Sequence, residues 1–382
     1  MRQLIVLAVV VLCATTGASA DETEIRIGDV PRTGSHFMNA REAALCGAGA
    51  ATADLSAVFR NPAAAGMVEG AEGFASMRVN IKTRDYLPQG DESLDATDDG
   101  LLFSQAAAVK TSDSWSFGFA YATPSYRSLD LSGAVETGER PLESYSGEFT
   151  GSFRTFEAVL TSRIGSRGQG IIGLSAGVAT INETGREVVG SDLTDSWEID
   201  GLGSCYAVGF IFAPSDRVSI GAGYRFSSEI DVEGTGLGLD GETGTFTTAP
   251  IATGGVSVLP TDRLALHASV IREGWHQADV ELDPDATAVL GSPSFDDPIL
   301  TVALGGEFDA TEKITLRAGY SLQMTGDIQD AAVPESAFGL GGTYAFNEYY
   351  VDAGYTYESF EIDGESGQIT NSGLHATVGY RF

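Results

Sequence analysis

The feature that most constrains this chain is a long series of short segments in which apolar and polar residues alternate. Alternation with a period of two is typical of β-strands that are buried or lipid-facing on one side. The clearest cases are Trp115–Tyr121 and Ile314–Leu322, where every second residue is aromatic or aliphatic. The predicted strands are 74–82, 101–109, 114–122, 151–162, 171–182, 204–213, 217–227, 248–258, 263–272, 299–308, 313–323, 335–346, 349–358 and 372–382.

The connections between these segments alternate strictly between short turns and long loops. Short turns include Ser112-Asp113 and Asn347-Glu348. Outer-membrane barrels have short periplasmic turns, long outer loops and an even number of antiparallel strands. We therefore predict an all-β fold, a 14-stranded antiparallel transmembrane β-barrel over residues 73–382, with both chain ends in the periplasm. The long connections are 84–100, 123–150, 183–203, 228–247, 273–298, 324–334 and 359–371.

The first twenty residues have the features of a secretory signal peptide. Arg2 supplies the positive charge, Leu4–Val11 is apolar, and Ala18–Ala20 is a small-residue cleavage site. No later apolar run is long enough for a transmembrane helix. The last residue, Phe382, ends an alternating segment and resembles the signal that the outer-membrane assembly machinery reads. These features predict export to a Gram-negative type of outer membrane.

The chain carries 53 acidic and 22 basic residues, a net charge of −31. The acidic residues are concentrated in the long connections. One interpretation is a set of solvated loops in an acidic, salt-adapted proteome. The alternative is a face that binds divalent cations or bridges anionic outer-membrane lipid through them. The sign of the charge argues against a nucleic-acid partner.

A compact segment precedes the strands. Residues 40–70 are rich in Ala and Gly and contain Asn61-Pro62-Ala63. Pro62 lacks an N–H and disfavours a helical conformation at Asn61, so a helix that begins near Arg41 has to end before this point. Because this segment lies between the signal peptide and the first strand, residues 21–72 are predicted to form a separate N-terminal unit.

This arrangement resembles the FadL family of outer-membrane transporters, which carry long-chain fatty acids and other hydrophobic compounds. In that family an N-terminal plug with an Asn-Pro-Ala motif fills the lumen of a 14-stranded barrel. The resemblance implies passive transport of a fatty acid or another hydrophobic small molecule, which passes the plug and leaves through the barrel wall. It is specific in residues 41–67, whereas the shorter chain and the polar outer loops depart from the family. The alternatives are a binding platform for secreted proteins and a plugged pore for small polar solutes.

If the apolar side chains face lipid, the opposite phase of each strand faces the lumen. Its charged residues have two interpretations: they anchor the plug through ion pairs, or some arginines hold a ligand carboxylate. Its glycines would make room for the plug. The charged residues are Arg78, Arg225, Arg317, Arg381, Glu307, Asp352 and Glu157; the glycines are Gly221, Gly223, Gly305, Gly319, Gly339, Gly341 and Gly354.

Three further expectations concern a kink in the wall, a disulfide bond and the absence of catalytic or metal-binding motifs. The family has an inward kink in the third strand, for which Gly118 and the nearby Pro124 are candidates. Cys46 and Cys205 could form a disulfide between plug and barrel, the alternative being two free thiols. We find no metal-ligand spacing, nucleophile elbow or dinucleotide fingerprint, so we expect no metal, no cofactor and no enzymatic activity.

Overall fold

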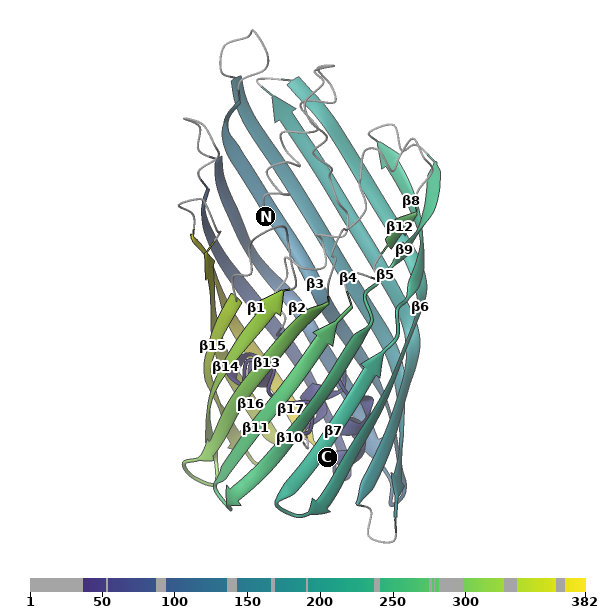
Figure 1. Cartoon of the computed structure of the whole chain (residues 1–382), viewed down its shortest axis with the longest axis vertical. Helices are drawn as coiled ribbons and strands as arrows, with labels where there is room; N and C mark the ends of the chain where they lie inside the picture. Colours follow the sequence, from purple (N-terminus) through teal and green to yellow (C-terminus); the bar gives the residue numbers. More distant parts are fainter. Residues whose placement is uncertain are drawn as a thin grey trace.

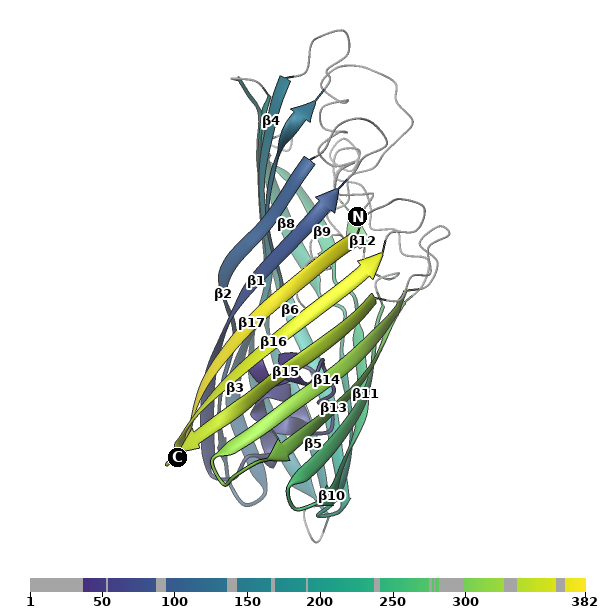
Figure 2. The same cartoon turned by 90° about the vertical axis from the view of Figure 1, so that its left-hand side faces the viewer.

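The computed structural model of the chain describes residues 37–52, 54–86, 94–135, 143–165, 169–189, 192–236, 241–274, 277, 279–281, 298–325, 335–361 and 368–382. These residues form one tall antiparallel barrel around a compact inner segment (Figures 1 and 2). The barrel closes because β1 (Ala71–Tyr86) pairs with both β2 (Leu94–Thr111) and β17 (Gln368–Arg381). Within the described ranges, no helix has the length and apolarity to cross a membrane. The predicted signal peptide, residues 1–20, lies outside the described residues.

The barrel wall contains fourteen strands, three of which are each divided into two segments. The divided strands are β7 (Val218–Arg225) with β8 (Glu229–Gly236), β9 (Glu242–Thr247) with β10 (Ile251–Thr261), and β11 (Leu264–Glu273) with β12 (Asp279–Glu281). The others are β3 (Trp115–Val135), β4 (Glu143–Ile164), β5 (Gly170–Val189), β6 (Asp192–Ser215), β13 (Ile299–Asp309), β14 (Ile314–Thr325), β15 (Glu335–Phe346) and β16 (Tyr349–Glu361). Each predicted strand overlaps one of these, so the predicted barrel is confirmed.

Side chains alternate between the two faces of the wall as the sequence pattern predicts. On β6, Tyr206 and Phe210 are 51% and 40% exposed, whereas Cys205, Ala207 and Ile211 are buried. The outward face therefore presents large apolar side chains to lipid, and the inward face packs on the inner segment.

The inner segment, residues 37–70, is called the plug from here on. Its α2 (Ala40–Ala44) begins after Asn39, whose side chain accepts a hydrogen bond from the N–H of Glu42. It ends before Cys46 and Gly47, which have φ angles of 49° and 82° and turn the chain. Two 3₁₀ helices follow, η2 (Leu55–Ala57) and η3 (Pro62–Met67). The predicted helix near Arg41 thus stops well before the Asn-Pro pair, and the wall begins at Ala71.

The plug backbone lies directly against inward glycines of the wall. A Cβ added at Gly354 would lie 2.3 Å from the carbonyl oxygen of Ala40, and one at Gly319 would lie 2.3 Å from the carbonyl carbon of Leu45. Contacts this close exclude any larger residue unless the plug moves. The predicted role of these glycines is confirmed. Plug backbone is equally close at Gly173, Gly221, Gly223 and Gly339; plug side chains are the nearest atoms at Gly209 and Gly305, and at Gly341 the wall carbonyl of Ala353 is nearest, followed by the Ala44 side chain.

We predict that Gly354→Ala weakens the attachment of the plug because the new methyl group collides with backbone. The matched control is Gly254→Ala on β10, where a Cβ would meet no atom within 4 Å. Both variants should form barrels that shift on unheated gels. Limited proteolysis should then cleave residues 37–70 faster in Gly354→Ala than in the control. Equal cleavage rates would contradict the close packing described above.

Candidate functional site

The Asn61-Pro62-Ala63 motif fixes the plug to the wall. The Asn61 side chain donates to the carbonyl oxygens of Ala50 at 2.9 Å and Phe210 at 3.3 Å, and accepts from the N–H of Ala63 at 3.1 Å. Pro62 occupies the first position of η3, where a missing N–H has no cost. Asn61 therefore joins two parts of the plug to β6.

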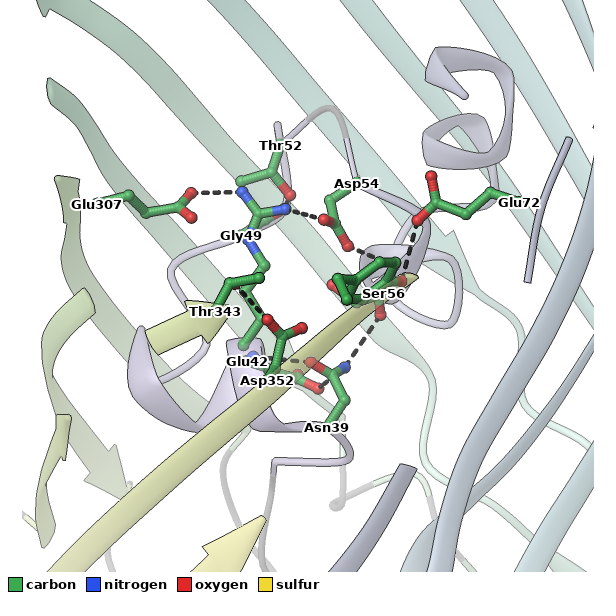
Figure 3. A network of polar contacts seen from close by, with 12 residues as sticks. Asn39, Glu42, Gly49, Thr52, Asp54, Ser56, Glu72, Glu307, Thr343 and Asp352 are labelled. Atoms are coloured by element: carbon green, nitrogen blue, oxygen red, sulfur yellow. Dashed lines mark hydrogen bonds and ion pairs between the residues drawn. The ribbon is translucent and has the colours of Figure 1, made fainter. Parts of the chain in front are cut away.

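A buried cluster of charges joins the plug to the other side of the barrel. Glu307 of β13 accepts from Arg317 at 2.6 Å and bonds to His267 at 2.8 Å. Arg41 of the plug contacts both Glu307 and Asp54, and Figure 3 shows these two carboxylates pointing toward each other from wall and plug. Arg317 also contacts Asp352 at 3.4 Å. Glu307 thus pairs directly with the plug, whereas Arg317 and Asp352 pair within the wall beside it, and plug anchoring by these residues stays a prediction.

The Asp54 carboxyl remains ionised inside this cluster. Burial opposes its ionisation, but the Arg41 guanidinium and hydrogen bonds from Ser56 outweigh burial and hold the pKa of Asp54 below its ordinary value. Asp54 therefore stabilises the cluster as an anion.

Arg225 holds a second plug contact on the opposite side of the lumen. Its guanidinium makes two bonds to Glu157 of β4, at 2.8 and 3.3 Å, and donates to the Phe59 carbonyl oxygen at 3.0 Å. It also lies 3.8 Å from the centre of the Phe59 ring. The charge of Arg225 is thus balanced by a carboxylate within the protein.

The two remaining predicted arginines differ from each other. Arg78 is fully buried and donates to the carbonyl oxygen of Phe37 at 3.4 Å, so it contacts the plug. The Arg381 side chain is 61% exposed, pairs with the buried Glu72 of β1 at 3.3 Å and lies 5.0 Å from the centre of the buried Tyr350 ring. It is the last residue of β17, and its role toward plug or ligand stays a prediction.

The predicted disulfide is absent, since Cys46 and Cys205 are both buried free thiols. Cys46 packs with Phe37 and Ala337, whereas Cys205 lies on β6 in the cavity described below. Burial and the charge of Glu358 raise the pKa of the Cys46 thiol to about 12, so it remains protonated. The two sulfur atoms therefore serve as small apolar groups in different surroundings.

The wall is interrupted near Pro124, and the prediction of a kink at Gly118 is wrong. Gly118 has regular partners on both sides. In the described backbone, β2–β3 register partners stop at Ala122 and resume at Asp130, and the β3–β4 register shifts between Ala122 and Ser125. Pro124 explains why the pairing is interrupted here, because proline has no N–H to donate a hydrogen bond to the neighbouring strand.

A cavity of about 70 Å³, here called the plug cavity, lies between the plug and the wall beside this interruption. Its apolar side is formed by Met38, Phe59, Pro124, Phe153, Phe246 and Ile251. Its other lining residues are Arg60, Cys205, Arg225, Ser228, Thr248, Ala249 and Glu273. Sequence reasoning missed the apolar set, although Phe59 is conspicuous as an aromatic residue within an Ala- and Gly-rich stretch.

The inner face above the plug cavity is also apolar. A Cβ at Gly201 would lie 2.7–2.8 Å from the side chains of Ile181, Ile230 and Val232, so these three residues pack together. Phe246, which lines the plug cavity, is buried on the neighbouring β9. An apolar surface therefore extends upward from the cavity along β5 to β9.

No group of three or more His, Cys, Asp or Glu side chains suited to a metal ion occurs in the described parts of the chain. Much of the long connections expected to bind divalent cations, including 282–297 and 326–334, lies outside the described residues. That expectation stays a prediction.

We predict that Glu307→Gln lowers the free energy of unfolding by about 3 kcal/mol, because it leaves buried Arg41, Arg317 and His267 without their shared carboxylate. The control is Asp262→Asn, which breaks an exposed pair with Arg217 and should change this free energy by less than about 1 kcal/mol. Urea titration of the folded barrel in lipid vesicles measures both. Equal effects would show that the cluster does not stabilise the fold.

Acid should weaken the same cluster through Asp54. The pKa of Asp54 is lower in the folded protein than in the unfolded chain. Its contribution to the stability of the plug is therefore complete above the unfolded pKa of about 3.9, and it is lost as the pH falls toward the pKa of the folded state. Proteolysis of the plug should therefore accelerate below about pH 4. Asp54→Asn should show faster proteolysis already at neutral pH and a smaller increase in the proteolysis rate on acidification. If that increase were unchanged in the variant, Asp54 would be excluded as the group responsible.

Comparisons with known proteins agree with this architecture. A family described as "Outer membrane protein transport protein (OMPP1/FadL/TodX)" matches residues 38–377. The chain is similar to a Pseudomonas aeruginosa FadL homologue, with 16% identity, a TM-score of 0.63, and coverage of 91% of this chain and 99% of that one. Two further solved structures share the fold: the P. putida toluene transporter TodX (14% identity, TM-score 0.64, 91% and 99% covered) and the Ralstonia pickettii toluene transporter TbuX (15%, 0.62, 91% and 99%).

No curated protein matches the chain. The family match covers most of the chain, from the start of the plug into the last strand. This protein therefore belongs to the OMPP1/FadL/TodX family of outer-membrane β-barrel transporters of hydrophobic compounds.

Proposed function

We propose that the protein is a passive outer-membrane channel for compact hydrophobic compounds. A ligand descends along the apolar inner face of β5 to β9, binds in the plug cavity and leaves sideways between β2 and β3. The observation that carries this proposal is the position of Pro124, which lines the cavity and also lies at the interruption of the wall. The short turns, and with them Phe382, would face the periplasm.

The charges around the plug cavity argue against a fatty-acid carboxylate as the preferred ligand. Arg225 is paired with Glu157, and Arg60 contacts Glu42. Glu273 adds a further carboxylate to the lining. A ligand carboxylate would have to displace an existing partner of these arginines, which costs free energy. The cavity thus favours small apolar molecules, in keeping with the toluene transporters that share this fold.

Support for a sideways exit comes from what lies below the cavity. The plug backbone packs against wall glycines through contacts that leave no room for a Cβ. The Asn61 bonds and the Arg41 cluster hold it there. At the interruption, by contrast, Thr123 replaces a ladder bond by donating its hydroxyl to the Phe103 carbonyl oxygen at 3.2 Å. A single side-chain bond is easier to open than a packed plug.

Uptake of radiolabelled toluene and dodecanoate by a host without its own transporters tests the proposal. We expect toluene uptake above the empty-vector level and little gain for dodecanoate. Ala249→Trp, which fills the plug cavity, should remove the gain. Ala222→Trp is the matched control, because this residue faces outward on β7.

Dodecanoate uptake that exceeds toluene uptake would overturn the assigned ligand class and return the channel to fatty acids. Absence of uptake of either compound by correctly folded protein would overturn the channel itself. It would favour the binding platform for secreted proteins.

A further inference from the structure

The barrel wall is taller on one side than on the other (Figure 1), since β6 has 24 residues and β14 has 12. The outward side chains of β6 are mostly apolar from Phe212 to Leu202, and the next outward residue, Asp200, is charged. At about 3.4 Å per residue and a tilt of about 40°, the apolar stretch covers about 25 Å, the height of the lipid-facing band of such barrels. Above Leu202 the wall therefore lies at the level of the lipid head groups.

An open groove of about 1040 Å³, here called the head-group groove, lies on the outward face of the wall at this level. Its side chains come from β4, β5, β6, β8 and β9, in two rows that the strand register aligns. The lower row contains Arg154, Leu202 and Asp231, and the upper row contains Asn182, Asp200 and Glu233.

The head-group groove is continuous with the lipid-facing surface. Phe156 and Val178, the next outward residues below the lower row on β4 and β5, are 53% and 46% exposed. Leu202 of the lower row is itself 59% exposed. A molecule that lies in this groove therefore has its lower end in the hydrocarbon, which is the property of a membrane lipid.

The charged side chains of the groove are available to a ligand. In the part of the chain that the structure describes, no hydrogen bond or ion pair engages the side chains of Arg154, Asp231 or Glu233. Asp200 accepts one hydrogen bond, from Asn182 at 2.7 Å. Unpaired positive charge thus lies on the β4 side of the groove, and unpaired negative charge lies on the β8 side.

This arrangement matches a head group that carries both signs of charge. An arginine guanidinium binds two oxygens of a phosphate through paired N–H donors. Carboxylates accept hydrogen bonds from an ammonium group. Arg154 and Asp231 lie three strands apart, at about 4.8 Å per strand, so a head group between them can contact both long side chain and carboxylate. A purely anionic head would meet one arginine and three carboxylates.

We propose that the head-group groove binds an outer-leaflet lipid with a phosphoethanolamine head. The phosphate contacts Arg154, and the primary ammonium contacts Asp231 and Glu233. The acyl chains continue downward along Phe156 and Val178. The site lies on the outside of the wall and is independent of transport through the lumen. A lipid bound there fixes the depth of the tall side of the barrel in the membrane.

Native mass spectrometry of the purified full chain in detergent, with EDTA present, tests this with three lipids that share their acyl chains. The lipids are phosphatidylethanolamine, phosphatidylcholine and phosphatidylglycerol. Phosphatidylcholine has the same phosphate, but its methylated ammonium donates no hydrogen bond. We expect phosphatidylethanolamine to bind about fivefold more tightly than phosphatidylcholine, the upper range for an exposed charge pair, and phosphatidylglycerol to bind least.

Variants locate the two ends of the head group. Asp231→Asn combined with Glu233→Gln should remove the preference for phosphatidylethanolamine over phosphatidylcholine. Arg154→Gln should weaken the binding of both lipids equally, because both carry the phosphate. Asp216→Asn, in an exposed turn at the other end of the barrel, is the matched control and should change neither.

Equal binding of phosphatidylethanolamine and phosphatidylcholine by the unchanged protein would overturn the proposal. A preference that survives the double substitution would also overturn it, because the lipid would then bind elsewhere. Binding of phosphatidylglycerol that appears with Mg²⁺ and disappears with EDTA would assign the groove to a bridging cation instead. The comparison among lipids on the unchanged protein does not depend on the folding of any variant.

Discussion

A chain segment inside a narrow barrel has to bring its own backbone into contact with the wall, and this contact determines the rest of the structure. Inward glycines permit it, because the carbonyl groups of Ala40, Leu45 and other plug residues lie where a Cβ would be. The plug is thereby placed closely enough for Arg41 to reach Glu307 and for Asn61 to reach the backbone of β6. Buried charges are tolerable there because they are paired, either within the plug, within the wall or, through Arg41 and Glu307, between the two.

The position of the plug also creates the plug cavity. Above it, aromatic residues from β4 and β9 face Phe59, and the space between them is apolar. Toward β11 to β16 the inner face carries carboxyl, amide and hydroxyl groups. Arg60 lines both the plug cavity and the small space on that side of the plug.

The barrel could be predicted from the sequence because its strands follow a strict local rule. The alternation of apolar and polar residues marks each strand that crosses the membrane. The glycines among the inward-facing residues indicated where the plug lies. Features that depend on distance in space could not be predicted in this way. The strand pattern placed Arg381 in the inward phase but could not show that its side chain is 61% exposed and pairs with Glu72, whereas Arg78 is fully buried. Two cysteines in one lumen suggested a bond, although only the fold shows that their surroundings differ.

The interruption of the wall is a further feature that the sequence alone could not locate. Gly118 and Pro124 were both visible in the third strand, but the sequence does not say which backbone group loses its partner. The answer follows from the missing N–H of Pro124 and the substituted bond from Thr123. The plug cavity was missed for a related reason: its residues come from the plug and from strands far apart in the chain, so no spacing in the sequence connects them.

The central claim is that a hydrophobic ligand binds between the plug and the interrupted wall. A crystal structure of the protein with 4-bromotoluene, phased to locate bromine by anomalous scattering, tests this most directly. The account predicts a bromine peak among Phe59, Phe246 and Pro124. A well-ordered peak elsewhere in the lumen, with this cavity empty, would contradict it.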